Sequence, residues 1–108
     1  MRYRHPERDV ERWHSYALRA GWYESHWPTL SAIIWRESAG NPRAYNPERQ
    51  ARTPRGWGSY GLTQMYAWAN REWLYAFVKR DLRRLYNPLV NLRAARRLHE
   101  EYGWKPWR

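Results

Sequence analysis

A helical segment that carries a charged residue on its apolar face is the feature that most constrains how this chain can fold. Leu30, Ile33 and Ile34 recur at the spacing of one face of a helix. Glu37 takes the next position on that same face. An apolar stripe that continues into a carboxylate is unusual, because that face normally packs against a core. The pattern therefore predicts a packed helix that ends with a partly shielded Glu37.

A carboxyl group in that position should hold its proton more firmly than one in water. Burial disfavours the charged form and raises the pKa, and the dipole at the C-terminal end of a helix acts in the same direction. A carboxyl that stays protonated near neutral pH can donate its proton to a leaving oxygen, as cleavage of a glycosidic bond requires. Helical position alone also allows another interpretation, in which Glu37 is a surface residue ion-paired with Arg36 or Arg43.

The rest of the chain is mostly helical in pattern. Apolar residues from Val10 onwards predict a first helix that stops at Gly21, with His14 as a packed, hydrogen-bonded core histidine. Pro28 suits the first turn of the second helix, and Gly40-Asn41-Pro42 ends it. The apolar face of a third helix, over about residues 67–84, comprises Leu74, Phe77, Val78, Leu82 and Leu85.

The last helix has clear signals at both ends. Asn87 and Pro88 read as its N-cap and first residue, and the pattern continues to Tyr102 before Gly103. No ladder of strands is evident, although short extended segments around Tyr45 and residues 59–62 are compatible with the sequence. We therefore expect a mainly α fold.

The amino-acid composition limits the classes of partner and of functional site that the chain can have. The chain has 108 residues, 20 Lys and Arg against 10 Asp and Glu, and a net charge of +10, which favours polyanionic partners such as nucleic acid, an anionic membrane or a bacterial wall. Nine Trp and nine Tyr against one Phe indicate rings that serve partly exposed surfaces, where they can stack on sugars or bases. The absence of cysteine excludes disulfides and thiolate metal sites, and the scattered histidines predict neither a metal nor a cofactor.

Three segments, taken together, resemble a known family. They run Glu37-Ser38-Ala39-Gly40-Asn41-Pro42, then Ser59-Tyr60-Gly61-Leu62-Thr63-Gln64, then Asn87-Pro88-Leu89-Val90-Asn91-Leu92. In this order they resemble the catalytic domain of soluble lytic transglycosylases and goose-type lysozymes, in the compact form found in phage and actinobacterial proteins. The match is good over residues 28–65 and thinner over residues 86–107. It implies a lysozyme-like domain of two lobes with a substrate groove between them.

The resemblance implies roles for individual residues. Glu37 matches the single catalytic acid/base, which cleaves the β-1,4 bond between N-acetylmuramic acid and N-acetylglucosamine. Gln64 borders the sugar groove, and Asn46 stands where the family often has a serine near the reacting sugar. The remaining candidates for contact with substrate are Tyr45, Ser59, Tyr60, Tyr102 and Trp104.

Two departures from the family affect the interpretation. The usual downstream Ala-Tyr-Asn motif is missing. The aromatic residue that closes the site is expected among Tyr102, Trp104 and Trp107, and the sequence does not decide which of the three it is. Hydrolysis usually needs a second carboxylate, and of the candidates Glu48, Glu72 and Asp81 only Glu48 is easily placed near the site. The motifs therefore favour the lyase reaction, in which the sugar supplies its own nucleophile.

Other functions remain open from the sequence. The charge, the aromatic residues and an arginine row on the last helix would also suit a small nucleic-acid-binding module, and a cationic surface alone can act on bacteria. For the enzyme we expect peptidoglycan strands and anionic wall polymers as partners. We also expect a monomeric, single domain over residues 1–108, with residues 1–8 as a flexible arm. Neither a signal peptide nor a transmembrane segment is recognisable, so action at the bacterial wall would need another export route, a virion, or a larger parent protein.

Overall fold

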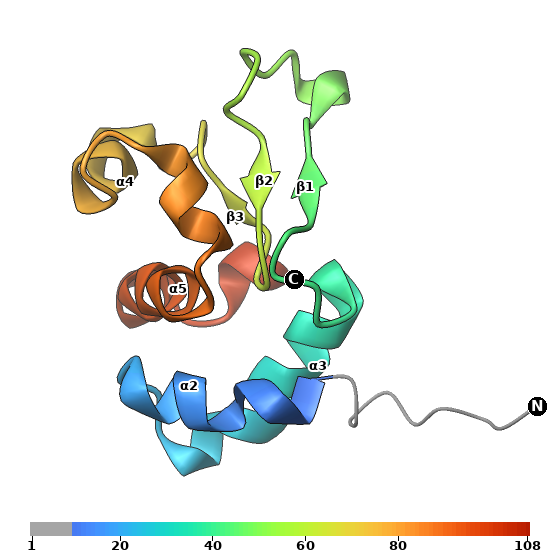
Figure 1. Ribbon diagram of the computed structural model, residues 1–108, viewed down its shortest axis with the longest axis vertical. Helices are drawn as coiled ribbons and strands as arrows, with labels where there is room; N and C mark the ends of the chain where they lie inside the picture. The colour runs from blue at the N-terminus through green and yellow to red at the C-terminus, as the bar shows by residue number, and fades with distance from the viewer. Residues whose placement is uncertain (1–9) are drawn as a thin grey trace, which may run out of the picture.

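The computed structural model describes residues 10–108, so the expected arm at residues 1–8 lies outside the described range. The chain is mainly helical with one small sheet, as the sequence predicts (Figure 1). In chain order its helices are η1 (Glu11–Trp13), α2 (His14–Arg19), η2 (Glu24–His26), α3 (Trp27–Ser38), η3 (Arg49–Ala51), α4 (Arg71–Phe77), η4 (Leu82–Tyr86), α5 (Pro88–Tyr102) and η5 (Lys105–Trp107).

Helix α3 confirms the segment on which the sequence analysis depends. Leu30, Ile33 and Ile34 are buried, and Pro28 lies in the first turn. The helix ends at Ser38 because Ala39 adopts a left-handed conformation, with φ of 53°. In helix α2, Leu18 was expected on the inner face but is exposed.

The structure contains a small strand ladder that was not evident in the sequence. The strands β1 (Tyr45–Asn46), β2 (Ser59–Tyr60) and β3 (Met65–Tyr66) form an antiparallel sheet in that order. Each strand has two residues, which is too short to produce an alternating pattern in the sequence. Two of them fall at the extended segments that the sequence allowed, whereas β3 was not anticipated.

The third predicted helix is shorter than expected. Helix α4 ends at Phe77, and Lys79 and Arg80 adopt left-handed conformations with φ of 57° and 64°, which a helix cannot contain. The chain then continues as the 3-10 helix η4. Of the predicted apolar face, Leu74, Val78 and Leu85 are buried, Leu82 is partly buried and Phe77 is exposed.

Helix α5 joins two parts of the molecule. It contacts α2 on one side and η4 and β3 on the other, so that the sheet with α4 and η4 forms one part and α2 with α3 the other (Figure 1). Asn87 caps the helix as predicted, since its Oδ1 accepts hydrogen bonds from the N–H groups of Leu89 and Val90. No helix within residues 10–108 is long and apolar enough to cross a membrane.

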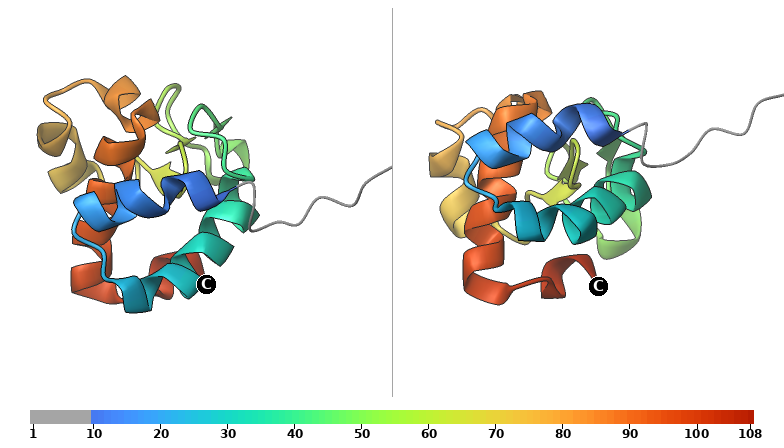
Figure 2. Two further views of the ribbon diagram at one scale, coloured as in Figure 1. Left: turned by 60° about the horizontal axis from the view of Figure 1, so that its bottom comes forward. Right: turned by 90° about the horizontal axis from the view of Figure 1, so that it is seen from below.

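The C-terminal segment packs back on the molecule, as its aromatic content predicts. Both views of Figure 2 place η5 beside α3. Trp107 is 6% exposed, and its indole N–H donates to the carbonyl oxygen of Thr63 at 3.0 Å. The chain end is therefore part of the wall around the turn between β2 and β3.

Candidate active site

Glu37 lies in the last turn of α3 and is only partly shielded. Its side chain is 29% exposed, and its Oε2 accepts a hydrogen bond from Arg36 Nη2 at 3.1 Å. The predicted shielding and the alternative ion pair with Arg36 are thus both present. Arg36 also donates to the carbonyl oxygen of Trp107, so one guanidinium joins the carboxylate to the C-terminal segment.

The turn between β2 and β3 is fixed against the end of α3. The hydroxyl of Ser38, the residue after Glu37, donates to the carbonyl oxygen of Leu62 at 2.8 Å and to that of Ile34 at 3.0 Å. The position of Glu37 is therefore tied directly to the turn that carries Gln64.

Asn91 holds the same turn from the other side, and the sequence analysis assigned it no role. Its side chain is completely buried on α5. The Oδ1 oxygen accepts from the N–H and the hydroxyl of Thr63, and Nδ2 donates to the carbonyl oxygens of Tyr60 and Leu85. An amide that makes four hydrogen bonds at zero exposure is a structural anchor, and a polar residue among the apolar positions of α5 is the signal that could have revealed it.

Gly61 allows this close packing. Its φ is 74°, and a Cβ atom there would lie 2.5 Å from Asn91 Nδ2 and 2.6 Å from the carbonyl oxygen of Leu85. Both the backbone conformation and the available space therefore require glycine.

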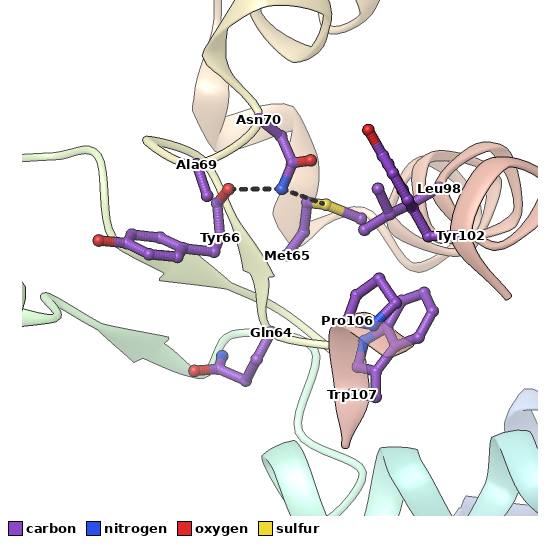
Figure 3. A pocket seen from close by; sticks show the side chains of 9 residues that line it. All are labelled: Gln64, Met65, Tyr66, Ala69, Asn70, Leu98, Tyr102, Pro106 and Trp107. Carbon is purple, nitrogen blue, oxygen red and sulfur yellow. Dashed lines mark hydrogen bonds between the residues drawn. The ribbon is translucent and has the colours of Figure 1, made fainter. Parts of the chain in front are cut away.

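A pocket of about 330 Å³ opens beside this turn (Figure 3). Gln64 and Tyr102, both expected to bind substrate, line it from the turn and from the end of α5. The Nε2 group of Gln64 donates to the carbonyl oxygens of Ala44 and Gly61, which fixes the orientation of the amide. The other lining residues are Met65, Tyr66, Ala69, Asn70, Leu98, Pro106 and Trp107.

Glu37 is connected to this pocket through the C-terminal segment. Trp107 forms part of the pocket wall, and its carbonyl oxygen and the Glu37 carboxylate both accept hydrogen bonds from Arg36. Glu37 itself does not line the pocket; it is linked to the pocket wall through Arg36 and, by way of Ser38, to the turn that carries Gln64.

Asn46 and Ser59 lie together on the sheet with a second carboxylate. They are paired across β1 and β2, so their side chains share a face. The Ser59 hydroxyl donates to Glu48 Oε2 at 2.7 Å, and the N–H of Glu48 donates to Asn46 Oδ1 at 2.9 Å. Asn46 and Ser59 are therefore neighbours on one face of the sheet, with Glu48 beside them.

The other sequence candidates lie elsewhere. Tyr45 and Tyr60 are also paired across the strands, but on the face opposite Asn46 and Ser59, where they line a different pocket. Trp104 does not line the pocket of Gln64 and instead stacks on Trp22, with ring centroids 5.6 Å apart. The residues expected to contact substrate are therefore divided among four places: the pocket of Gln64 and Tyr102, the face of Asn46 and Ser59, the pocket of Tyr45 and Tyr60, and the contact of Trp104 with Trp22.

The three histidines within residues 10–108 form structural contacts. His14 is stacked on Trp27 and hydrogen-bonded to Glu24 and Glu11, as predicted, but its side chain is 28% exposed, so the expected place in the core is wrong. Burial and the nearby Arg96 lower the pKa of both His26 and His99, which lie against Trp22 and Trp104. Within residues 10–108, no three side chains of His, Asp or Glu cluster as they would around a metal ion.

A small helical domain with two parts, in which a glutamate at a helix end is linked by hydrogen bonds to the wall of a pocket, is compatible with a lysozyme-like fold. Comparison with protein families agrees, since the transglycosylase SLT domain matches residues 15–103. The chain belongs to this family, whose lytic transglycosylase activity is directed at cell-wall peptidoglycan. Searches of curated proteins and of solved structures found no match.

Proposed function

We propose that this protein is a lytic transglycosylase that cleaves the β-1,4 bond between N-acetylmuramic acid and N-acetylglucosamine, with Glu37 as its only catalytic acid and base. The observation that carries this proposal is the place of Glu37. Its side chain is partly shielded at the end of α3 and is linked by hydrogen bonds of Arg36 and Ser38 to the C-terminal wall and the turn that shape the pocket.

The reaction requires one proton to leave the carboxyl group and one to return. Glu37 donates its proton to the glycosidic oxygen as the bond to the muramoyl C1 breaks, so the N-acetylglucosamine side leaves with a free hydroxyl. The muramoyl 6-hydroxyl then bonds to C1 and gives its proton to the Glu37 carboxylate. The product is a 1,6-anhydro ring, and the enzyme returns to its starting state.

Arg36 and Gln64 suit the supporting roles in this sequence. The guanidinium of Arg36 stabilises the carboxylate form that exists between the two proton transfers. Gln64 is held by two hydrogen bonds from its Nε2, and within residues 10–108 its Oε1 accepts none, so this oxygen is available for the N–H of an N-acetyl group. Tyr102, 53% exposed at the rim, offers a ring for a sugar face.

Hydrolysis is the second candidate, because Glu48 supplies another carboxylate on the sheet. A hydrolase would use such a group to activate water against the sugar. Glu48 accepts a hydrogen bond from Ser59, which holds the carboxylate in a defined orientation. The lyase reaction remains our proposal because it needs only one carboxylate, and the hydrogen bonds of Arg36 and Ser38 that link Glu37 to the pocket wall support that choice.

The proposed setting is the bacterial wall, where the protein acts as a monomer without a metal or cofactor. A net charge of +10 would concentrate it on a surface that carries carboxylates and phosphates. We do not favour a nucleic-acid-binding module, because that function gives no reason for the contacts that join Glu37, Ser38 and the Gln64 turn.

The test is the release of soluble muropeptides from purified peptidoglycan by Glu37→Gln and Glu48→Gln variants. We expect Glu37→Gln to lose at least about a thousandfold in rate with its fold intact, because the amide cannot transfer a proton. Glu48→Gln is the matched control and should retain most of the activity. A Glu37→Gln protein that remains active would contradict the proposal, and loss in both variants would favour the hydrolase.

A further inference from the structure

A second and larger pocket lies on the face of the sheet opposite Asn46 and Ser59. Its volume is about 840 Å³, and it is bounded by β1, β2, the loop that contains η3, and η4. Three rings and three guanidinium groups dominate its lining, which comprises Tyr45, Pro47, Arg49, Thr53, Arg55, Gly56, Tyr60, Arg83 and Tyr86. The proposed reaction uses none of these residues.

The tyrosine wall of this pocket is rigid. The Tyr60 hydroxyl donates to the carbonyl oxygen of Gly56, and the Tyr45 hydroxyl accepts from the N–H of Gly58 at 3.2 Å. The ring centroid of Tyr60 lies 4.8 Å from that of Tyr45 and 5.2 Å from that of Tyr86. Burial, with Tyr45 and Tyr86 nearby, raises the pKa of Tyr60 to about 12, so its hydroxyl keeps the proton that it donates.

The rim of the pocket is strongly cationic. Arg83 is paired with Asp81, with Nε and Oδ1 3.1 Å apart. Arg49 and Arg55 form no ion pair with any acidic residue in the part of the chain that the structure describes, and both are exposed. Among the residues that the structure describes, no carboxylate lines the pocket. A ligand that enters between Arg49 and Arg55 therefore meets positive charge above a wall of rings.

We propose that this pocket binds a phosphate group of a phosphodiester-linked sugar or polyol polymer of the bacterial wall. Guanidinium groups match phosphate oxygens with paired hydrogen bonds, and tyrosine rings pack against the C–H groups of the adjoining sugar or polyol. The volume is ample for one repeating unit of such a polymer. The inference depends on the proposed function only for the location of the protein at the wall.

Two separate sites on one small domain would reinforce each other. The glycan would occupy the pocket of Gln64 and Tyr102, while the anionic polymer would occupy the tyrosine and arginine pocket, and the two pockets share no lining residue. Binding of one polymer raises the effective concentration of the other in an intact wall. The advantage should decrease with added salt, because the arginines are exposed.

The experiment measures direct binding by a Glu37→Gln protein, so that the result does not depend on catalysis. The probe is a purified oligo(glycerol phosphate), with polyglutamate and oligothymidylate of similar charge as comparisons. The test variant adds Arg49→Gln and Arg55→Gln. The matched control adds Arg19→Gln and Arg93→Gln, which remove the same charge from exposed positions on α2 and α5 outside the pocket.

We expect saturable binding of oligo(glycerol phosphate) that weakens about tenfold or more in the Arg49 and Arg55 variant and less than about threefold in the control. Polyglutamate should bind more weakly than the phosphate oligomer. Equal losses in both variants would overturn the proposal, because diffuse charge would then explain binding. Tighter binding of oligothymidylate at the same pocket would assign it to nucleic acid instead, and absence of saturable binding would also contradict the inference.

Discussion

The side-chain oxygen of Asn91 accepts two hydrogen bonds from Thr63, one from the backbone N–H at 3.1 Å and one from the hydroxyl at 2.7 Å. Thr63 is the residue before Gln64, and its carbonyl oxygen accepts from the indole of Trp107. One residue of the turn is thus held by α5 and by the C-terminal segment together. The geometry of the candidate site therefore depends on a buried amide that does not itself face the pocket.

Replacing Asn91 should reduce stability severely. Asn91→Leu keeps a similar volume but leaves two donors on Thr63 and two carbonyl oxygens without partners inside the core. We expect the free energy of unfolding to fall by at least about 3 kcal/mol. The control Asn87→Ala, which removes an exposed helix cap, should cost only about 1 kcal/mol. Urea denaturation measures both, and similar losses would show that Asn91 is no anchor.

Alanine variants of Gly61 and Gly56 test the tight packing at the turn, with Gly56 as the control position. Both have positive φ, 74° and 84°, so alanine is strained at either position. An added Cβ at Gly61 meets Asn91 and Leu85, whereas at Gly56 nothing lies within 4 Å. Gly56→Ala should cost about 1 kcal/mol of stability, and Gly61→Ala about 1–3 kcal/mol more. Equal melting temperatures for the two variants would contradict the close approach.

His99 and His14 should make the free energy of unfolding depend on pH in opposite directions. Burial, together with the nearby His26 and Arg96, lowers the pKa of His99 in the folded protein below its ordinary value of 6.5, so the unfolded chain binds its proton first as the pH falls. The stability that His99 contributes is therefore present above that pH and is lost as the pH falls through the lowered pKa. Replacing it by glutamine should make the loss of stability between about pH 8 and pH 5 smaller.

His14 should behave in the opposite way. Burial lowers its pKa, but hydrogen bonds with Glu24 and Glu11 outweigh this effect and raise it. Its contribution is full below 6.5 and is lost as the pH rises through the raised pKa. His14→Gln should therefore make the acid loss steeper. Urea midpoints across this range measure both variants, and slopes that change in the same direction would contradict the assignment.

Comparing variants of Tyr102 and Tyr23 distinguishes sugar binding at the pocket from a general effect of exposed aromatic rings. Tyr102 lines the pocket of Gln64 and is 53% exposed, whereas Tyr23 is 64% exposed and lies outside that pocket. We expect Tyr102→Ala to weaken binding of a chitin-type oligosaccharide about tenfold, as loss of one stacking ring would. Tyr23→Ala should leave the affinity unchanged. Titration calorimetry with both variants decides the matter, and an unaltered affinity for Tyr102→Ala would remove this ring from the site.

Sequence patterns revealed the long elements and missed the short ones. The apolar spacing in α3 and α5 and the Asn87 cap correspond to the structure because periodicity and capping act locally. The two-residue strands depend on pairing between distant segments, and the break at Lys79 and Arg80 depends on backbone conformations that these residue types rarely adopt. Neither feature leaves a local pattern to recognise.

Some features of the candidate site could likewise be predicted from the sequence, and others could not. The motif residues Glu37 and Gln64 could be proposed from sequence, and the structure ties both to one turn. The role of Asn91 and the separation of Tyr45 from Asn46 could not, because they depend on which face of a short sheet each side chain occupies. Trp104 looked equivalent to Tyr102 in the sequence, yet it packs on Trp22.

The most direct test asks whether a single carboxylate serves both proton transfers. Peptidoglycan is digested in water labelled with heavy oxygen, and the masses of the products are measured by mass spectrometry. If the sugar supplies its own hydroxyl, the muramoyl ends are 1,6-anhydro rings that contain no labelled oxygen. Reducing ends that carry the heavy isotope would mean that water attacked, and the account of Glu37 acting alone would be wrong.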